Sequence, residues 1–422
     1  MRAIDRFNNF IEGYGIIKIL LPVFLFFQPF QHFAGVRNTS FILLLLIFLI
    51  RLFSGRTRID FRDRTVQALI ILAAVSLLSA GLSPYALESF HAIRKNLSYQ
   101  VVIFLIIICE YRSLEEVRPL VYALLAGFAA LTLLIIFNNR PEVILNWLDY
   151  TDKKYTRGYS LFATFYIPLA VAYLYSMRES LKVKYLITCF LFAEFILSVL
   201  NNHRGQIVAI VLSVAVLTLV ARRFKVFVIG AAVCLVAGGV LLKAKPDMYD
   251  RYKTLLSPST YLTNEYRGWN NRFAIWSGTV DMIKKRPVTG WGYGWKKIAH
   301  VARDGGYLER WDKAAPSYHY FKGASYGQAN PHNLLLQLLF EIGFLGLLAF
   351  LLFWFTILVK AVSASGRSGV AADFLKYACT GVLLSYAIIN VSNGLWEESI
   401  GMVIIAFAAI VLIAHRDMVR AG

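Results

Sequence analysis

The stretch ANPHNLLLQLLFEIGFLGLL (residues 329–348) joins a polar region to an apolar run of the kind that crosses a membrane. Pro331, His332 and Asn333 lie where the two meet. Proline is favoured where the chain enters a helix, so a helix is predicted to begin near Asn333. A titratable ring at the mouth of a membrane helix serves either as a polar cap or as a chemical group.

The whole chain has the composition of a membrane protein. Of its 422 residues, 58% are hydrophobic and only 16% are charged, whereas soluble domains carry about 25% charged residues. Many apolar runs are long enough to span a bilayer as helices. These features predict an all-α polytopic membrane protein. The four cysteines lie in apolar segments, so neither a disulfide framework nor a thiol metal site is expected.

About twelve transmembrane helices are predicted, together with one long polar loop. Three parts follow: residues 1–243 with helices one to nine, residues 244–331 as the loop with short helices, and residues 332–422 with helices ten to twelve. The predicted spans are 14–34, 39–55, 66–84, 99–111, 118–137, 159–177, 184–201, 205–221, 226–243, 343–362, 374–392 and 399–415.

Positive charge orients the predicted spans. The net charge is +19, and most short loops rich in Lys or Arg fall on one side if residue 1 is cytoplasmic. The positive-inside rule therefore predicts cytoplasmic N- and C-termini, although HAIRKN and DKKYTR run against the trend. No basic and aromatic module stands apart from the spans, so nucleic acid is not an expected partner.

The long loop then lies outside. Residues 245–331 hold fourteen Lys and Arg against seven Asp and Glu, among many aromatic residues. Such a loop suits an anionic, sugar-bearing ligand, but also contact with lipid headgroups. A helix is predicted over 271–285, ended by Pro287, with apolar contacts from Phe273, Ile275, Trp276, Val280 and Ile283.

Three places in the sequence hold residues that could bind or react with a substrate, and two of them contain arginines. Arg204 lies in a very short outside turn before Gly205, where it can either anchor the helix at the membrane surface or bind a ligand. Arg267 and Arg272 lie in the loop and can stack on tryptophan or bind phosphate. Guanidinium groups form two parallel hydrogen bonds to phosphate oxygens, so two convergent arginines would suit a diphosphate.

The third place is His332. A lone histidine at such a junction is more often a polar cap than a catalyst, yet its usual pKa near 6.5 suits proton removal from a sugar hydroxyl. Gln337 and Glu341 would lie one and two helical turns further in. The chain lacks the D-x-D and H-E-x-x-H patterns of metal sites, so arginine is expected to supply the positive charge without a metal or other cofactor.

At these three places the sequence resembles the O-antigen ligase family, which also contains O-antigen polymerases and protein O-oligosaccharyltransferases. The resemblance rests on HRGQ, NRFAIW…RPVTGWGYG and PHNLLLQLLFEIGFLG, within about 150 residues of the second half. It implies a GT-C-like glycosyltransferase architecture in the bacterial inner membrane. It also implies transfer of O-antigen polysaccharide from an undecaprenyl diphosphate carrier to a sugar hydroxyl of lipid A-core, without a metal and with inversion.

The resemblance also implies roles for individual residues. His332 would be the general base, and Arg204 and Arg272, with Arg267 as a further candidate, would bind the diphosphate. His203 stands where family members commonly have a small hydroxyl residue, which leaves open whether it shares in proton transfer. The supporting residues would be His203, Asn333, Gln337 and Glu341. Apart from the resemblance, the sequence leaves open whether Glu397 and Glu398, beside Trp396 at an outside turn, are supporting acids.

Two other functions remain open from sequence. A polymerase of the same group would have a nearly identical site and differ in its acceptor; the single long loop favours the ligase. A lipid-linked sugar transporter or flippase would place ionisable residues within its spans. Here the polar candidates gather at one face, and Glu194 is the main exception.

Overall fold

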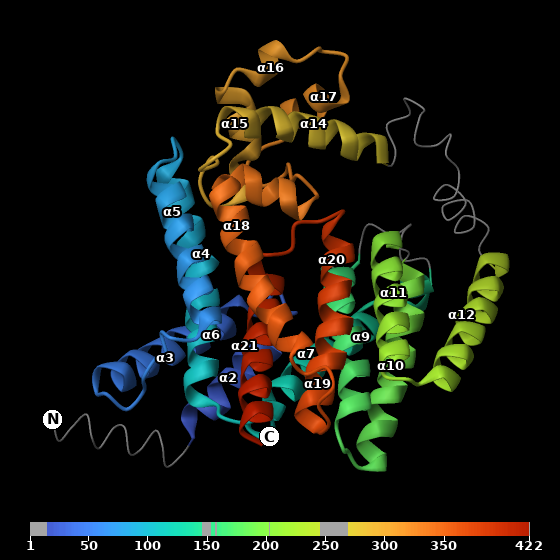
Figure 1. Ribbon diagram of the computed structural model, residues 1–422. Coiled ribbons are helices and arrows are strands. Elements are labelled where there is room, and N and C mark those ends of the chain that lie inside the picture. The colour runs from blue at the N-terminus through green and yellow to red at the C-terminus, as the bar shows by residue number, and fades with distance from the viewer. Residues whose placement is uncertain (1–14, 146–152, 157, 202, 245–268, 422) are drawn as a thin grey trace.

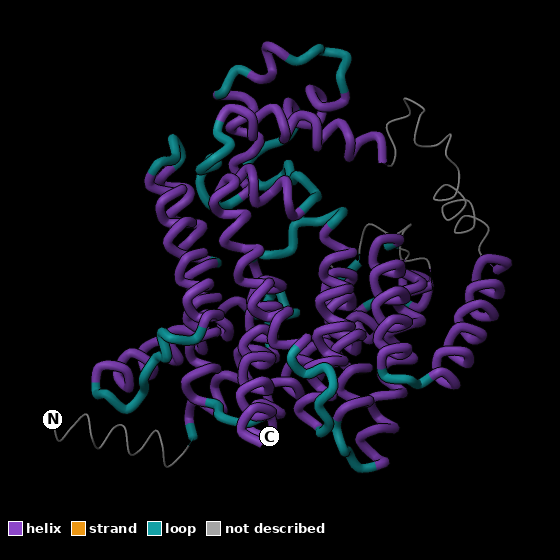
Figure 2. Tube along the Cα trace, in the orientation of Figure 1, coloured by secondary structure: helices purple, strands orange, loops and turns teal. Residues whose placement is uncertain are grey.

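The computed structural model describes residues 15–145, 153–156, 158–201, 203–244 and 269–421. These residues form a bundle of long helices with a layer of short helices over one end (Figure 1). The helices are joined by loops, and the described residues include no strand (Figure 2). The all-helical prediction is therefore confirmed.

The first half of the chain contributes the following helices: α2 (Ile16–Phe26), α3 (Ala34–Phe53), α4 (Arg64–Gly81), α5 (Ala86–Lys95), α6 (Leu97–Glu110), α7 (Leu114–Asn138), α8 (Pro141–Leu145), α9 (Tyr159–Ser176), α10 (Leu181–Asn201), α11 (Arg204–Val220) and α12 (Phe224–Ala244). The second half contributes α14 (Trp269–Lys285), η2 (Trp295–Lys297), α15 (Ile298–Asp304), α16 (Tyr307–Arg310), α17 (Pro316–Lys322), α18 (Leu334–Val362), α19 (Val370–Ala378), the π-helical turn η3 (Cys379–Leu383), α20 (Leu384–Asn390) and α21 (Glu398–Ala421).

Nine helices in the described residues are long and apolar enough to cross a membrane. Three shorter apolar helices, α2, α11 and α12, lie at three further predicted spans, so the count of twelve is not confirmed. Two of the predicted spans are parts of longer helices. The helix containing 99–111 begins upstream at Ala86, which makes most of HAIRKN helical, and the helix containing 343–362 begins at Leu334, next to the predicted start near Asn333.

The centre of the bundle is formed by α9 and α21, whose apolar windows are each 78% buried. By contrast, α3 and α10 are only 28% buried over theirs. Because exposed apolar side chains this numerous are stable only against lipid, α3 and α10 lie at the periphery, where the bilayer would surround them.

Helix α18 bends at Gly343, and its two parts run in different directions (Figure 1). Gly343 has φ 67° and ψ −168°, which releases the following N–H groups from the helix. The Phe344 and Leu345 N–H groups donate instead to the carbonyl oxygens of Pro287 and Val288, at 2.8 and 3.2 Å. The loop after α14 is thereby fixed against the bend, which attaches the short-helix layer to the bundle.

The short-helix layer has a core of its own. Ile275 and Ile283 on α14 are buried against residues of α15 and α17, including Ile298 and Phe321. The predicted helix over 271–285 corresponds to α14. Phe273, expected to supply an apolar contact, is 56% exposed, because it lies on the side of α14 opposite this core.

Candidate functional site

His332 lies at the entrance of α18 in a constrained conformation. Its φ of 51° falls in the left-handed region, which few non-glycine residues adopt. Its N–H donates to Asn330 Oδ1 at 2.6 Å, and Asn330 is held in turn by hydrogen bonds with the Tyr320 hydroxyl at 2.9 and 3.2 Å. Asn333 caps α18, because its Oδ1 accepts from Leu336 N at 3.0 Å.

Arg272 reaches from α14 to the entrance of α18. Its Nη1 donates to the backbone oxygens of Ser392, at 2.5 Å, and of His332, at 3.3 Å. Within the described residues, these are carbonyl groups and not carboxylates, so the guanidinium is oriented without being neutralised. Its other edge makes no hydrogen bond to the part of the chain that the structure describes.

Helix α11 brings His203 and Arg204 to the same place. His203 Nδ1 accepts from Gln206 N at 3.3 Å and thereby caps the helix. Gly205 lies against Ser392, where a β-carbon would be 3.3 Å from Ser392 Oγ. The residue that orients Arg272 therefore also contacts the turn that carries Arg204, so the sequence motifs converge on Ser392.

The charge of Arg272 acts on both histidines. Burial, followed by the nearby Arg272, lowers the pKa of His332 to about 4. Burial and Arg272 also lower the pKa of His203 below its usual value. Both rings are therefore neutral at pH 7 in the ligand-free protein, and each has a nitrogen lone pair able to accept a hydrogen bond.

The other predicted site residues lie below His332 or outside the described residues. Gln337 and Glu341 are both fully buried on α18. Arg267 lies outside the described residues, whereas Arg272 lies beside His332 and Ser392. Among the described residues, no group of three or more His, Cys, Asp or Glu side chains could hold a metal ion.

The segment from Val391 to Glu397 lies between α20 and α21, and only its last residue, Glu397, was a candidate from the sequence. The segment provides the Ser392 oxygen to Arg272, and its Val391 oxygen accepts from Asn333 Nδ2 at 3.1 Å. Both contacts use backbone atoms, which have no signature in the sequence. Only the polar run SNGLWEE between two apolar spans indicated a surface turn.

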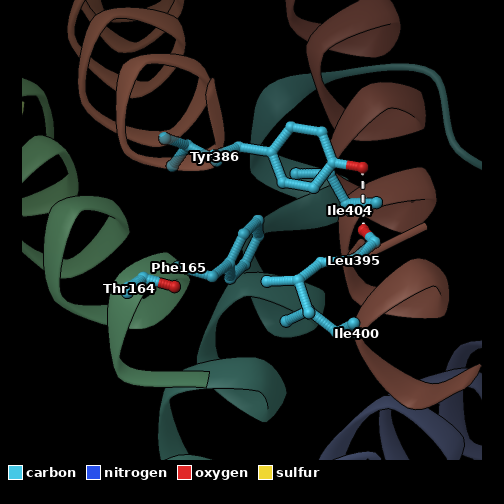
Figure 3. A pocket seen from close by; sticks show the side chains of 7 residues that line it. Thr164, Phe165, Tyr386, Leu395, Ile400 and Ile404 are labelled. Carbon is cyan, nitrogen blue, oxygen red and sulfur yellow. Dashed lines mark hydrogen bonds between the residues drawn. The ribbon is translucent and has the colours of Figure 1, made fainter. Parts of the chain in front are cut away.

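A small apolar cavity lies beside this segment, between α9, α20 and α21 (Figure 3). The Tyr386 hydroxyl at its edge donates to the Leu395 oxygen at 2.7 Å. The cavity is lined by Thr164, Phe165, Val382, Tyr386, Leu395, Ile400 and Ile404. Because no charged side chain lines it, it is a packing void of the bundle and not a site for an anionic substrate.

Comparison with known proteins agrees with the geometry. Residues 187–351 match the family model described as O-antigen ligase, a range that contains Arg204, Arg272 and His332. No curated protein is similar enough to this chain to be matched. The segment 187–351 of this multi-pass membrane protein is therefore similar to the O-antigen ligase family.

Proposed function

We propose that the protein transfers O-antigen polysaccharide from undecaprenyl diphosphate to a sugar hydroxyl of lipid A-core, at the periplasmic face of the inner membrane. One observation carries the proposal: Arg272, His332 and the Arg204 turn meet around the Ser392 backbone, at the end of the bundle covered by the basic loop. An unneutralised guanidinium beside a neutral imidazole suits a reaction that releases a diphosphate and removes a hydroxyl proton.

The proposed reaction is a single displacement. The acceptor hydroxyl oxygen attacks the anomeric carbon of the donor, and the bond from that carbon to the diphosphate oxygen breaks. The hydroxyl proton passes to His332, and the electron pair leaves with the carrier diphosphate. Arg272 and Arg204 stabilise the charge that grows on the leaving group, a role usually worth about 3 kcal/mol or more for each preorganised donor.

Substrate binding would make His332 a better base. Burial and the charge of Arg272 hold the pKa of His332 at about 4 in the ligand-free protein. A diphosphate bound to Arg272 offsets that positive charge, which removes one of the two causes of the lowered pKa. The ring is then a stronger base when the donor is in place than in the ligand-free protein.

The opposite end of the bundle is the proposed cytoplasmic side. The helix ends there hold Arg51 on α3, Lys360 on α18 and Arg416 on α21, which agrees with the positive-inside rule. The last helix, α21, ends on that side, away from α14–α17 (Figure 1). The substrate-binding end would then face the periplasm, where both lipid-linked substrates can enter from the bilayer.

Replacing His332 with Ala tests the proposed general base. Purified protein is given carrier-linked glycan and lipid A-core, and we expect kcat to fall by about 10²–10⁴-fold. His91→Ala is the matched control, since His91 is exposed and lies away from the site. Full transfer by the His332 variant would overturn the assignment.

Two conservative arginine variants test the diphosphate clamp. Arg272→Lys and Arg204→Lys keep the positive charge but lose the paired donors, so we expect kcat/KM to fall by about tenfold or more. Arg310→Lys in the same layer is the control, because Arg310 donates to the Gly305 and Gly306 backbone oxygens and lies over the Tyr307 ring, all within its own short helix and turn. Wild-type turnover in both variants would show that no bidentate contact is made.

The same assay separates the ligase from a polymerase and tests the role of metals. Label appearing on lipid A-core supports the ligase, whereas glycan growth on the carrier would identify a polymerase. We expect full activity in the presence of a chelator, because arginines supply the positive charge. Activity that a chelator abolishes and a divalent cation restores would contradict the proposal.

A further inference from the structure

A stripe of polar residues runs down the buried side of the first part of α18. Asn333, Gln337 and Glu341 are spaced four residues apart, which places them on one face of the helix. Gln337 and Glu341 are both 0% exposed. Burying an amide and a carboxyl group in a membrane bundle is costly unless both have partners, so their surroundings require an explanation.

Each residue of the stripe contacts the segment from Val391 to Glu397. Asn333 Nδ2 donates to the Val391 oxygen at 3.1 Å. Gln337 lies directly against Gly394, where any β-carbon would collide with its Oε1. Glu341 lies within hydrogen-bonding reach of Glu397. The stripe therefore follows the segment from its first residue to its last.

The contact between the two carboxyl groups needs a proton. Glu341 Oε2 accepts from Gly294 N at 2.9 Å, and Glu397 Oε2 accepts from Asn96 Nδ2 at 3.2 Å. The Oε1 atoms of Glu341 and Glu397 are both buried. When both carboxyl groups are ionised, neither Oε1 atom has a hydrogen-bond partner among the described residues. Two ionised carboxylates this close would repel strongly in a medium of low dielectric constant. One proton between them removes the repulsion and satisfies both atoms.

The charge of Lys297 balances the remaining carboxylate. Lys297 is 1% exposed, and its Nζ donates to the oxygens of Tyr293 and Gly294 at 2.7 and 2.6 Å. It interacts electrostatically with both Glu341 and Glu397. With one shared proton the three groups sum to zero charge, the state that burial favours.

Other charged and titratable groups surround this cluster. Glu397 is also influenced by Glu398, and Lys297 by Glu88. Lys296 is paired with Glu398 at 2.7 Å, so these two largely offset each other. The buried Tyr293 lies beside both carboxyl groups and has its pKa raised by burial, so it stays neutral. Burial, and then Glu341, raise the pKa of Glu397 well above its usual value.

We propose that Glu341 and Glu397 share one proton and, balanced by Lys297, form a positioning cluster that holds the Val391–Glu397 segment in place. Through this segment the cluster fixes the Ser392 oxygen, which orients Arg272 at 2.5 Å. The Glu341 side chain also binds Gly294, so the loop of the short-helix layer is held by the same group. The consequence for turnover rests on the function proposed above for Arg272.

The experiment is a series of variants that changes the charge of the cluster. Glu397→Gln copies the protonated carboxyl and keeps zero charge, so we expect it to retain most transfer activity. Glu341→Gln/Glu397→Gln leaves Lys297 unbalanced, and we expect kcat/KM to fall by about 10²-fold as the site is misplaced. Adding Lys297→Met restores neutrality, and we expect it to recover about tenfold of that loss.

The exposed Glu398→Gln is the control, since it makes the same substitution one residue away and leaves Glu341, Glu397 and Lys297 unchanged. Rescue by the triple variant supports the proposal, because a merely structural loss of side chains would grow with each substitution. A triple variant as inactive as the double variant, or worse, overturns it. A Glu397→Gln protein as inactive as the double variant also overturns it.

An infrared measurement tests the shared proton without any substrate. The difference spectrum of wild type minus Glu397→Gln should contain the carbonyl band of a protonated carboxyl group at pH 7. Absence of this band overturns proton sharing. The spectrum and thermal unfolding need no substrate, so they test the cluster even if the wild-type protein fails to transfer glycan. Such a failure would contradict the proposed function and leave the proposed cluster to be judged by the spectrum.

Discussion

Arg272, at one end of the helix bundle, is held differently from the basic residues at the other end. At the end where α4 begins, Asp63 pairs with Lys360 at 3.6 Å and with Arg416 at 3.4 Å. Arg51 pairs there with Glu110 at 3.1 Å. Each of these basic side chains has a carboxylate within the bundle, so that end is a set of structural ion pairs.

At the other end, Arg272 meets carbonyl oxygens instead. Those of Ser392 and His332 fix the direction of its guanidinium but carry no net charge. The comparison shows that a cation's direction can be fixed without its charge being neutralised. A carboxylate partner performs both, whereas a backbone carbonyl orients the cation and leaves its charge for an anionic substrate.

Introducing a carboxylate beside Arg272 should have the largest effect. Ser392→Asp would make the site resemble the opposite end, because the new side chain competes with the donor diphosphate. We expect kcat/KM to fall by about 10²-fold or more relative to Ser392→Asn, which has the same shape without the charge. Equal kcat/KM values for the two variants would show that the unneutralised charge of Arg272 is unimportant.

Gly343→Ala should disturb the bend in α18, where the loop after α14 is attached to the bundle. At φ 67° a β-carbon is strained, and at this position it would also collide with the Val288 oxygen. We expect a loss of about 2–3 kcal/mol in the free energy of unfolding, measured by thermal or denaturant unfolding.

Gly366→Ala is the control for this substitution. Gly366 also has a positive φ, of 83°, but nothing lies within 4 Å of the position of its β-carbon. We expect a loss of only about 1 kcal/mol there. Equal losses would mean that the close approach of the loop at Gly343 contributes nothing.

Asp63→Asn should lower stability while leaving transfer unchanged at a permissive temperature. Burial opposes ionisation of Asp63, but Lys360, the Thr65 N–H and Arg416 together hold its pKa below the usual value. We expect a loss of about 1–2 kcal/mol in unfolding free energy at pH 7.

The pH dependence of Asp63 has a defined sign. A lowered folded pKa gives stability that is present above the unfolded pKa, about 4, and is lost as pH falls through the folded value. Wild type should therefore lose more stability on acidification than Asp63→Asn. Parallel pH profiles of Tm for the two proteins would contradict the pairing.

The smallest expected effect is on the titration of His332. Its pKa of about 4 is caused first by burial and second by Arg272. In Arg272→Gln we expect this pKa to rise part of the way towards 6.5, since burial remains. Carbon-13 NMR of labelled histidines measures it, with the His332 signal assigned by comparison with His332→Ala. An unchanged or lower pKa would show that Arg272 does not act on the ring.

Much of the site was predictable because its parts are local in sequence. The start of α18 follows from Pro331 and the Asn333 cap, and α14 follows from its helical pattern before Pro287. Convergence was only partly predictable. The resemblance implied that Arg204, Arg272 and His332 lie at one site. It did not indicate the role of Ser392, because Ser392 binds Arg272 through its backbone oxygen, which every residue type has.

What the sequence determined by itself was the class of the molecule, an all-helical protein with many membrane-spanning helices. Apolar runs must become helices in a bilayer, because every backbone polar group there needs an internal partner. Only the tertiary structure decided what Glu341 does. Its partners Gly294 and Glu397, and the balancing Lys297, lie 44 to 56 residues away along the chain. A buried carboxyl group acquires its charge state from such partners, because desolvation and neighbouring charges, and not local sequence, set its protonation.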